Sequence, residues 1–250
     1  MLQLATRLFI FTIVFYGVTP ILHASDLEKE QRWREQIVDA LLDGEAADLN
    51  DGKHEFLAIH TEGDSSNNAG IIIMHGIGIH PDYPTVINPL RVGLAERGWH
   101  TLSIQLPVLP NEAEAKDYTP LVPEATSRVK AAKQYLQQLG LKKIAIVAHS
   151  MGTAMAAYAI DTGGVTVDAY VAIGMNKPAI APLANIRVPV LDLYGQDDLP
   201  EVTANAALRK TTAEKNSHYT QVVTENADHF FNGQEEALVS VVDNWLQDNL

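Results

Sequence analysis

The stretch that decides the fold is Val147-Ala148-His149-Ser150-Met151-Gly152-Thr153, which places one serine between an apolar strand and a helix of small residues. A chain that turns from a strand into a helix within about one residue forces a strained, exposed conformation on the turning residue, and small neighbours let the two elements pack closely. Ser150 is therefore a candidate nucleophile. The pattern is G-x-S-x-G with Ala148 in place of the first glycine, which adds one methyl group and keeps the position small.

Apolar strands alternate with helices on both sides of this stretch. Short apolar runs predict strands at Ile71–Met74, His100–Gln105, Lys143–Ala148, Ala169–Ile173, Val188–Tyr194 and Tyr219–Val223. Helical spacing of apolar residues predicts helices at Val86–Arg97, at Thr126–Leu139, directly after Ser150, at Glu201–Lys215 and at Gln234–Leu250. This alternation predicts a doubly wound, mainly parallel sheet with helices on both faces.

The N-terminal part of the chain has a different pattern. Residues Asp26–Glu45 carry apolar side chains at helical spacing, and a link rich in Gly, Asp and Asn leads from there to a short alternating strand at Phe56–His60. No boundary between two domains is visible along the 250 residues. We therefore expect residues 26–250 to form a single domain with one large core.

Residues 1–25 have the layout of a secretory signal peptide. Arg7 is their only charge, Leu8–Val18 is almost wholly apolar, and the small residues Ala24 and Ser25 precede an acidic stretch. A membrane anchor is the alternative, but a glycine and a proline interrupt the run, which falls short of the roughly 20 residues that span a bilayer. We expect cleavage after Ala24 or Ser25, export to the bacterial periplasm or the medium, and no stable membrane anchor afterwards.

The composition argues against several classes of function. There is no cysteine, so disulfide, thiolate–metal and lipoprotein chemistry are all excluded. The formal net charge is −13, and such a surface repels phosphate backbones and anionic lipid headgroups. We therefore expect no nucleic-acid partner.

Candidate site residues gather where the predicted strands end. In a sheet of this kind, ligands bind outside the carboxyl ends of the strands. Four clusters follow such ends and are predicted to share one edge: His75-Gly76-Ile77-Gly78, Ser150, Asp197-Asp198 and His229.

A base is needed beside Ser150, because a serine hydroxyl is a poor nucleophile until a base takes its proton. Among the nine histidines, His229 is the best candidate, since it follows the last strand. His218 precedes that strand and is predicted to face the opposite edge. His149 is adjacent to Ser150, but neighbouring side chains diverge at a tight turn.

A carboxylate is needed in turn to hold the tautomer of the base. Asp198 is preferred, because it lies three residues after Gly195 and directly before the helix-starting pair Leu199-Pro200. Asp197 is the alternative, with the other aspartate of the pair capping the next helix.

The glycines after the first buried strand have a different predicted role. They let the backbone approach a reacting carbonyl, so the N–H groups of Ile77 and Met151 are predicted to form an oxyanion hole. His75, His80 and Asp82 raise the alternative of a metal site, but their loose spacing does not supply the three oriented ligands of catalytic zinc. We expect neither a metal nor a cofactor.

The motifs His75-Gly76-x-Gly78, Ala148-His149-Ser150-Met151-Gly152, Gly195-x-x-Asp198 and Ala227-Asp228-His229 together resemble the α/β-hydrolase superfamily, in its chain order Ser, Asp, His. The similarity covers roughly residues 70–250. Within the superfamily the chain looks most like an uncharacterised group of exported bacterial proteins. The resemblance implies a serine hydrolase fold with Ser150, Asp198 and His229 as catalytic triad.

Many members of that superfamily carry a cap domain before the acid, but here only residues 174–187 are available for one. We expect no substantial cap and an open site whose rim comes from 79–84, 107–123 and 175–182. An open cleft favours a small-molecule substrate, an ester, thioester or amide of a short or medium acyl group. The alternatives are acyl transfer to an acceptor other than water and a non-catalytic, hydrolase-like protein that binds a component of the cell envelope.

Overall fold

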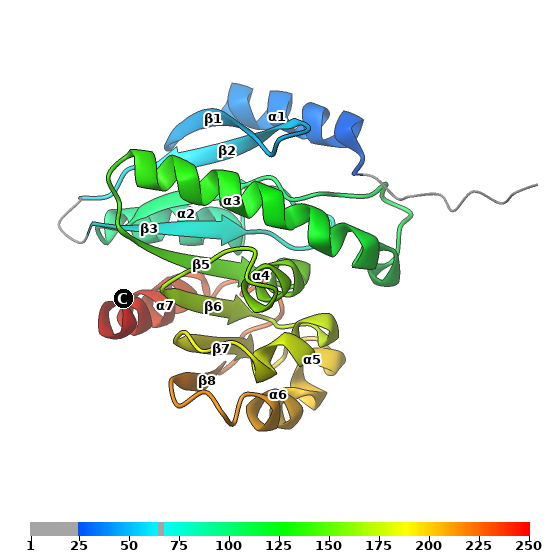
Figure 1. The fold of residues 1–250 in the computed structure, drawn as a ribbon, viewed down its shortest axis with the longest axis vertical. Helices are drawn as coiled ribbons and strands as arrows, with labels where there is room; N and C mark the ends of the chain where they lie inside the picture. The colour runs from blue at the N-terminus through cyan, green and yellow to red at the C-terminus, as the bar shows by residue number, and fades with distance from the viewer. Residues whose placement is uncertain (1–24, 65–67) are drawn as a thin grey trace, which may run out of the picture.

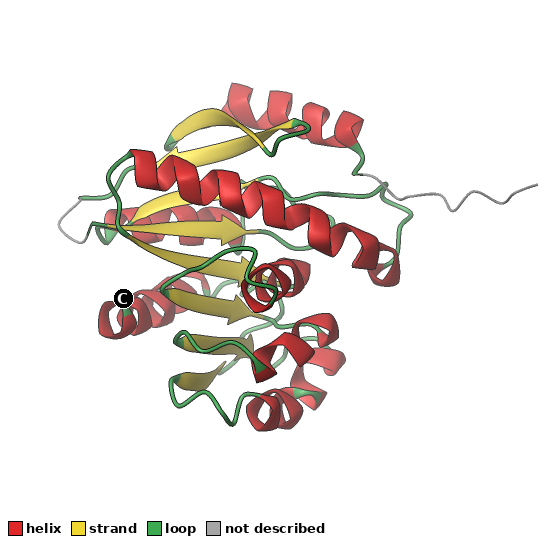
Figure 2. Cartoon of the chain, in the orientation of Figure 1, coloured by secondary structure: helices red, strands yellow, loops and turns green. Residues whose placement is uncertain are grey.

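The computed structural model describes residues 25–64 and 68–250. These residues form one eight-stranded sheet in the order β1-β2-β4-β3-β5-β6-β7-β8, with helices on both faces (Figures 1 and 2). The first two pairings are antiparallel and all the others are parallel. The predicted doubly wound, mainly parallel sheet is thus confirmed. The predicted signal peptide, apart from Ser25, lies outside the described residues.

The strands are β1 (Glu45–Asn50), β2 (Glu55–Thr61), β3 (Ala69–Met74), β4 (His100–Ile104), β5 (Lys143–His149), β6 (Ala169–Ile173), β7 (Val190–Gly195) and β8 (Tyr219–Thr224). The α-helices are α1 (Leu27–Ala40), α2 (Ile87–Glu96), α3 (Val122–Gln138), α4 (Met151–Asp161), α5 (Pro200–Ala204), α6 (Ala206–Thr212) and α7 (Glu235–Asn249). Short 3-10 helices are η2 (Ala115–Leu121), η3 (Lys177–Ala179) and η4 (Ala181–Ala184).

The central strands are buried on both faces. All residues of β3, β6 and β7 are buried, which explains why these strands are mainly apolar rather than alternating. The exception is Asp192 of β7, which pairs with the buried Arg209 at 2.7 Å. One core lies between the sheet and helices α3 and α4, and a second lies under α2 and α7 on the other face. The strand ends that carry the predicted site are therefore fixed by packing from both sides.

The N-terminal region differs from its prediction. Helix α1 ends at Ala40, and Glu45–Asn50 forms the edge strand β1, which the sequence pattern did not predict. Its residues are mostly exposed and include Glu, Ala and Leu, which favour helices, so the strand exists because it pairs along its whole length with β2. Tertiary pairing has overridden local preference.

Two helices also differ from their predicted bounds. Helix α3 begins at Val122, four residues earlier than expected, because Pro123 suits the first turn of a helix. The predicted helix Glu201–Lys215 is split into α5 and α6 at Asn205, whose side chain donates a hydrogen bond to the Glu201 carbonyl at 2.6 Å. Such a bond competes with helix propagation.

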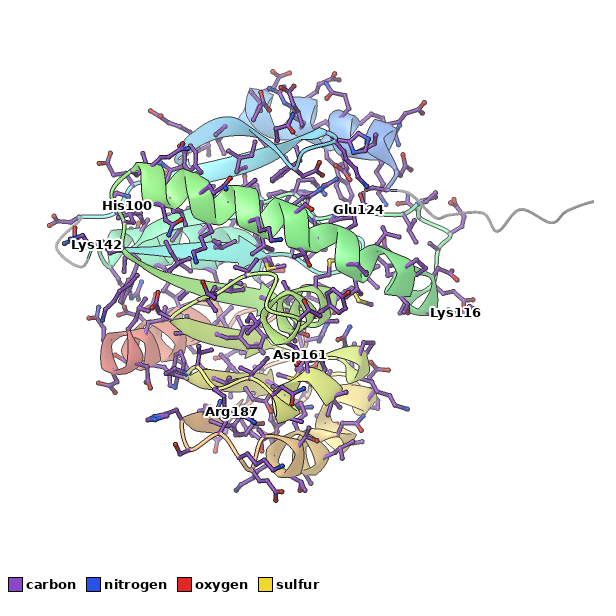
Figure 3. All side chains as sticks on the ribbon, in the orientation of Figure 1. His100, Lys116, Glu124, Lys142, Asp161 and Arg187 are labelled. Carbon is purple, nitrogen blue, oxygen red and sulfur yellow. The ribbon has the colours of Figure 1, made fainter. Side chains whose placement is uncertain are left out.

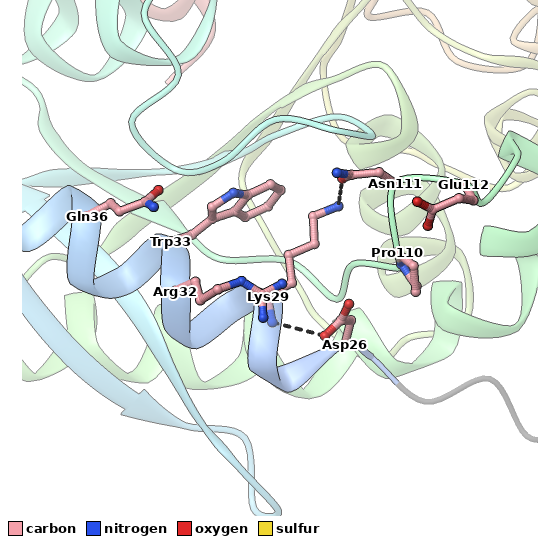
Figure 4. A pocket seen from close by; sticks show the side chains of 8 residues that line it. All are labelled: Asp26, Lys29, Arg32, Trp33, Gln36, Pro110, Asn111 and Glu112. Carbon is pink, nitrogen blue, oxygen red and sulfur yellow. Dashed lines mark hydrogen bonds between the residues drawn. The ribbon is translucent and has the colours of Figure 1, made fainter.

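Helix α1 is attached to the sheet by buried charges. The Arg128 guanidinium of α3 is fully buried and pairs with Glu30 of α1 at 2.8 Å and with Asp51 at 3.5 Å. Lys29 donates to the Leu109 carbonyl at 2.9 Å and to Asn111 Oδ1 at 2.8 Å, across a polar pocket between α1 and the segment after β4 (Figure 4). Because the Lys29 ammonium is already bound there, this pocket marks a junction between elements.

None of the helices within residues 25–64 and 68–250 is both long and apolar enough to cross a membrane.

Candidate active site

The carboxyl ends of the parallel strands lie along one edge of the sheet. In Figure 3, His100 and Lys142 mark the amino ends of β4 and β5, and Lys116, in the segment that follows β4, lies on the opposite side. The four predicted clusters all follow strands at that second edge, after β3, β5, β7 and β8. His218 precedes β8, and its carbonyl accepts a hydrogen bond from the Val190 N–H at the other edge.

Ser150 occupies the turn between β5 and α4. Its φ of +53° and ψ of −121° lie in a region that non-glycine residues seldom adopt. Gly152 is required two residues later, because a Cβ there would come within 2.6 Å of the His75 carbonyl oxygen and 2.7 Å of that of Met74. The chain therefore forms the sharp strand-to-helix turn that the sequence predicted, with Ala148 buried in the strand.

His229 and Asp198 form a buried pair. The distance from His229 Nδ1 to Asp198 Oδ1 is 2.6 Å, and both side chains are buried. Because a carboxylate only accepts hydrogen bonds, Nδ1 carries the proton, and Nε2 of the neutral ring can act as a base. Asp198 also accepts from the Leu199 N–H at 2.7 Å, whereas the side chain of Asp197 is exposed.

Gly174, at the end of β6, makes room for this pair, and the sequence analysis missed it. A Cβ at this position would come within 2.8 Å of Cε1 and 2.9 Å of Nδ1 of His229, and 3.4 Å of Asp198 Oδ2. Its φ is +57°, a value that also favours glycine. The sequence did offer a signal for this position: Gly174 is a glycine that directly follows the predicted strand 169–173, at the edge of the sheet where the site was expected.

Ser150 is linked to the pair through the end of β6. The Ser150 N–H donates to the Ile173 carbonyl at 2.9 Å, and the next residue, Gly174, lies against the His229 ring. Within the described part of the chain, the Ser150 hydroxyl makes no hydrogen bond to another residue. Hydrogen bonds between nucleophile and base are often loose in unliganded enzymes and tighten when substrate binds.

His75 shapes the loop predicted to supply the first oxyanion donor. Its Nε2 accepts from the Leu106 N–H at 3.0 Å, so the proton is on Nδ1, which donates to the Gly76 carbonyl at 2.8 Å. Burial lowers the pKa of His75 to about 3, which keeps the ring neutral. In a trans peptide the N–H points opposite to the C=O, so fixing the Gly76 carbonyl also fixes the direction of the Ile77 N–H.

The two predicted oxyanion donors lie beside a narrow crevice. The N–H groups of Ile77 and Met151 have no backbone acceptor among residues 25–64 and 68–250. Their side chains line the crevice together with His75, Gly76, Leu106, Pro107, Tyr118 and Met155. The crevice is mainly apolar and too narrow to admit a water molecule, so a hydrocarbon group can enter it only if the lining side chains move.

The three residues of the metal alternative have other partners. His80 Nδ1 accepts from the Asp82 N–H at 3.2 Å, and Asp82 Oδ1 accepts from Arg91 at 2.6 Å and from Asn88 at 2.9 Å. Both ring nitrogens of His75 are engaged as described above. No group of three or more His, Asp or Glu side chains suited to a metal ion occurs in the described ranges.

Among residues 25–64 and 68–250, nothing resembling a cap domain covers this edge. Between β6 and β7 the chain forms only the short helices η3 and η4. The prediction of an α/β-hydrolase fold without a substantial cap is confirmed.

Solved structures with the same fold support this classification. Est1E from Butyrivibrio proteoclasticus superposes with a TM-score of 0.67 at 14% identity, over 83% of this chain and 99% of that one. A dienelactone hydrolase from Anabaena variabilis superposes with a TM-score of 0.67 at 23% identity, over 83% and 98%. Esterase 2 from Thermogutta terrifontis, phosphoramylated by tabun, superposes with a TM-score of 0.64 at 17% identity, over 81% and 94%.

These similarities define the class of fold: the protein is an α/β-hydrolase-fold protein. Within this class, the chain belongs to the family described as "Protein of unknown function (DUF3530)", whose model matches residues 19–126 and 112–248. A comparison with curated proteins found no match.

Proposed function

We propose that the protein is a serine hydrolase that cleaves an ester, thioester or amide of a short or medium acyl group through an acyl-enzyme. The observation that carries the proposal is the buried His229–Asp198 pair, 2.6 Å apart, at the same sheet edge as the strained Ser150 turn. A nucleophile, a base with a free nitrogen and an acid that orients the base are the parts that acyl transfer to serine needs.

In the proposed reaction, Ser150 Oγ attacks the acyl carbon while its proton passes to His229 Nε2. Asp198 stabilises the imidazolium, and the N–H groups of Ile77 and Met151 bind the negative oxygen. His229 then protonates the leaving alcohol, thiol or amine as its bond to the acyl carbon breaks. A water molecule, deprotonated by His229, attacks the acyl-enzyme, and the acid leaves as Ser150 regains its proton.

Two features support the proposed substrate class. The crevice beside Ile77 and Met151 is mainly apolar and too narrow for a water molecule, so a long acyl chain would require a much larger movement of its lining side chains than a short one. No cap formed by the described part of the chain covers the site, which leaves room for a bulky leaving group to extend into solvent. Relatives of this fold named as an esterase and as a dienelactone hydrolase are consistent with such chemistry.

Labelling with a fluorophosphonate probe tests the nucleophile. We expect wild type to be labelled and Ser150→Ala to be inert, because the probe phosphonylates an activated serine. Ser127→Ala is the matched control, since the side chain of Ser127 is exposed on α3 and has no part in the proposed reaction, and its loss should leave labelling unchanged. Labelling that persists in Ser150→Ala would refute the assignment.

An acyl-chain series of p-nitrophenyl esters tests the substrate class. We expect kcat/KM to be highest for the shorter chains and to fall as the chain outgrows the crevice. If wild type is folded but inert towards both the probe and the whole series, the protein is a non-catalytic binding protein with a hydrolase fold.

We also propose that the protein is exported and that the signal peptide is removed between Ala24 and Ser25. Ser25 is buried against the segment after β4: its hydroxyl accepts from the Val108 N–H at 2.9 Å and is hydrogen-bonded to Glu30. Cleavage after Ser25 would remove these contacts. N-terminal sequencing of the processed protein should therefore begin at Ser25, and a chain that begins at Asp26 or retains Met1 would contradict this proposal.

A further inference from the structure

His149, the last residue of β5, is in contact with the loop that carries His229. Its side chain is 1% exposed, and Nε2 lies 2.9 Å from the His229 carbonyl oxygen, 80 residues away in sequence. A carbonyl oxygen only accepts, so His149 Nε2 carries a proton and donates it. Ser150 Cβ and His149 Nδ1 both lie close to Gly76, and the other nitrogen of the His149 ring reaches the backbone of the predicted base.

The loop that carries His229 has no regular secondary structure of its own. It runs from the end of β8 to the start of α7 and contains two non-glycine residues with positive φ, Asn226 at 56° and Phe231 at 54°. The Asp228 carboxylate accepts hydrogen bonds from N–H groups within this loop, which fixes its local shape. The bond from His149 is different, because it ties the loop to a central strand of the sheet.

The ring of His149 also packs against the side chain of the base. Its centroid lies 4.7 Å from that of His229 and 5.5 Å from that of Phe230. Asp198 holds the His229 imidazole at one nitrogen, and a single hydrogen bond leaves the ring free to pivot about it. Contacts to the His229 carbonyl and to the His229 ring from one rigid side chain remove that freedom.

We propose that His149 is a positioning residue for the base, whose Nε2–H donates to the His229 carbonyl and so holds the imidazole between Asp198 and Ser150. This inference rests on the proposed function and assigns a role to the residue that precedes the nucleophile. His149 touches no reacting atom and takes no proton from substrate.

The chemistry of an imidazole explains why a histidine suits this position. Burial, together with the neighbouring His229, lowers the pKa of His149 to about 3, so the donor stays neutral. Its Nδ1 has no hydrogen-bond partner among the described residues and lies against Gly76. A lysine or arginine in its place would put a permanent charge beside the imidazolium that forms during catalysis and would oppose its formation.

Two substitutions separate the hydrogen bond from the packing. His149→Phe keeps a planar ring and removes the donor, whereas His149→Gln keeps an N–H at a similar reach. We expect kcat for ester hydrolysis to fall by about 10- to 100-fold in His149→Phe with KM little changed, because small misplacements of a catalytic group have effects of this size. His149→Gln should recover most of the activity.

An NMR readout follows the base without depending on turnover. The His229 Nδ1 proton, held by Asp198, should give a far-downfield signal in wild type and in Ser150→Ala. We expect this signal to broaden in His149→Phe, as the ring becomes mobile, and to return in His149→Gln. Thermal unfolding of each variant shows that it is folded.

The outcomes are distinct. A folded His149→Phe with wild-type kcat and an unchanged signal would overturn the inference. It would also be overturned if His149→Gln were as impaired as His149→Phe, because the ring and not its N–H would then matter. If wild type fails to react with the fluorophosphonate probe while the signal still follows the donor, the proposed hydrolase function fails and the positioning of His229 by His149 is supported.

Discussion

The strand-end site and the junction that holds α1 bury polar groups in opposite ways. At the site, His75 and His149 are buried and neutral. His149 donates to the His229 carbonyl of another loop, and His75 donates to the adjacent Gly76 carbonyl and accepts from the Leu106 N–H of another segment. At the junction, Arg128 is fully buried with its charge paired to Glu30. The first region orders loops without adding charge, and the second attaches a helix with permanent charges.

This difference follows from what each region has to do. In the proposed reaction His229 becomes positively charged. His75 and His149 are neutral, so they do not oppose the formation of that charge. The junction has no charge to form or lose, so an ion pair can fix the position of α1. Burial raises the pKa of Glu30 even though Arg128 opposes the shift.

The largest expected effect comes from changing the partner of the base. Asp198→Asn would favour the wrong tautomer of His229, and kcat should fall by about 10⁴-fold. Asp197→Asn is the control and should leave kcat nearly unchanged, since the Asp197 side chain is exposed. Steady-state kinetics on the best ester decides between them, and a harmless Asp198→Asn would remove Asp198 from the mechanism.

Removing the charge at the junction should affect stability and leave the site intact. Arg128→Met would leave Glu30 buried without its partner, at a cost of about 3–5 kcal/mol in the free energy of unfolding. Arg34→Met removes a pair with Asp48 whose side chains are 33% and 41% exposed, and it should cost at most about 1 kcal/mol. Urea unfolding measures both. Equal costs would mean that the buried Arg128–Glu30 pair stabilises the fold no more than the exposed Arg34–Asp48 pair does.

Gly174 tests the space around the base with a matched control. Gly174 and Gly163 have φ values of 57° and 69°, so alanine at either should cost about 1–2 kcal/mol in backbone strain. Only at Gly174 would the new methyl group meet the His229 ring, since nothing lies within 4 Å of a Cβ at Gly163. We expect Gly174→Ala to lower kcat by about 100-fold and Gly163→Ala to leave it unchanged. Similar activities would show that the ring tolerates displacement.

The smallest expected effect is a pH dependence of stability that comes from the neutral histidines. Burial lowers the pKa of His75 and His149 to about 3, from the ordinary value of 6.5. Between pH 6.5 and about pH 3, each of these two histidines binds a proton in the unfolded chain but stays unprotonated in the folded chain. The stability due to each histidine is therefore present above pH 6.5 and is lost as the pH falls, by up to about 1.4 kcal/mol per pH unit.

Urea unfolding at several pH values between about 5 and 6.5 measures this slope. His149→Gln has no group that titrates at this position. The change in its free energy of unfolding with pH should therefore be smaller than that of wild type, by an amount that corresponds to up to about one bound proton. A variant with the wild-type slope would mean that His149 does not resist protonation in the folded state. Glu30 opposes the trend, because its raised pKa favours the folded state at low pH.

Much of the fold could be predicted from local pattern. Continuous apolar runs predicted the central parallel strands, and the rule that ligands bind at their carboxyl ends selected Ser150 and His229 from many serines and nine histidines. Strand β1 could not be predicted in this way, because its residues favour a helix and only pairing with β2 makes them extended. An edge strand depends on pairing with a neighbouring strand, and the sequence of the edge strand alone does not reveal that pairing.

By itself, the sequence determined the order of the central strands and of the long helices between them, the sharp turn at Ser150 and the edge at which polar residues collect, because these depend on periodicity and on residue size within a few positions. The tertiary structure decided that Asp198 and not Asp197 faces His229, that Gly174 leaves room for the ring, and that His149 reaches the His229 carbonyl. These relations join residues that are far apart along the chain, and they exist only after the sheet has packed and its loops have been brought together.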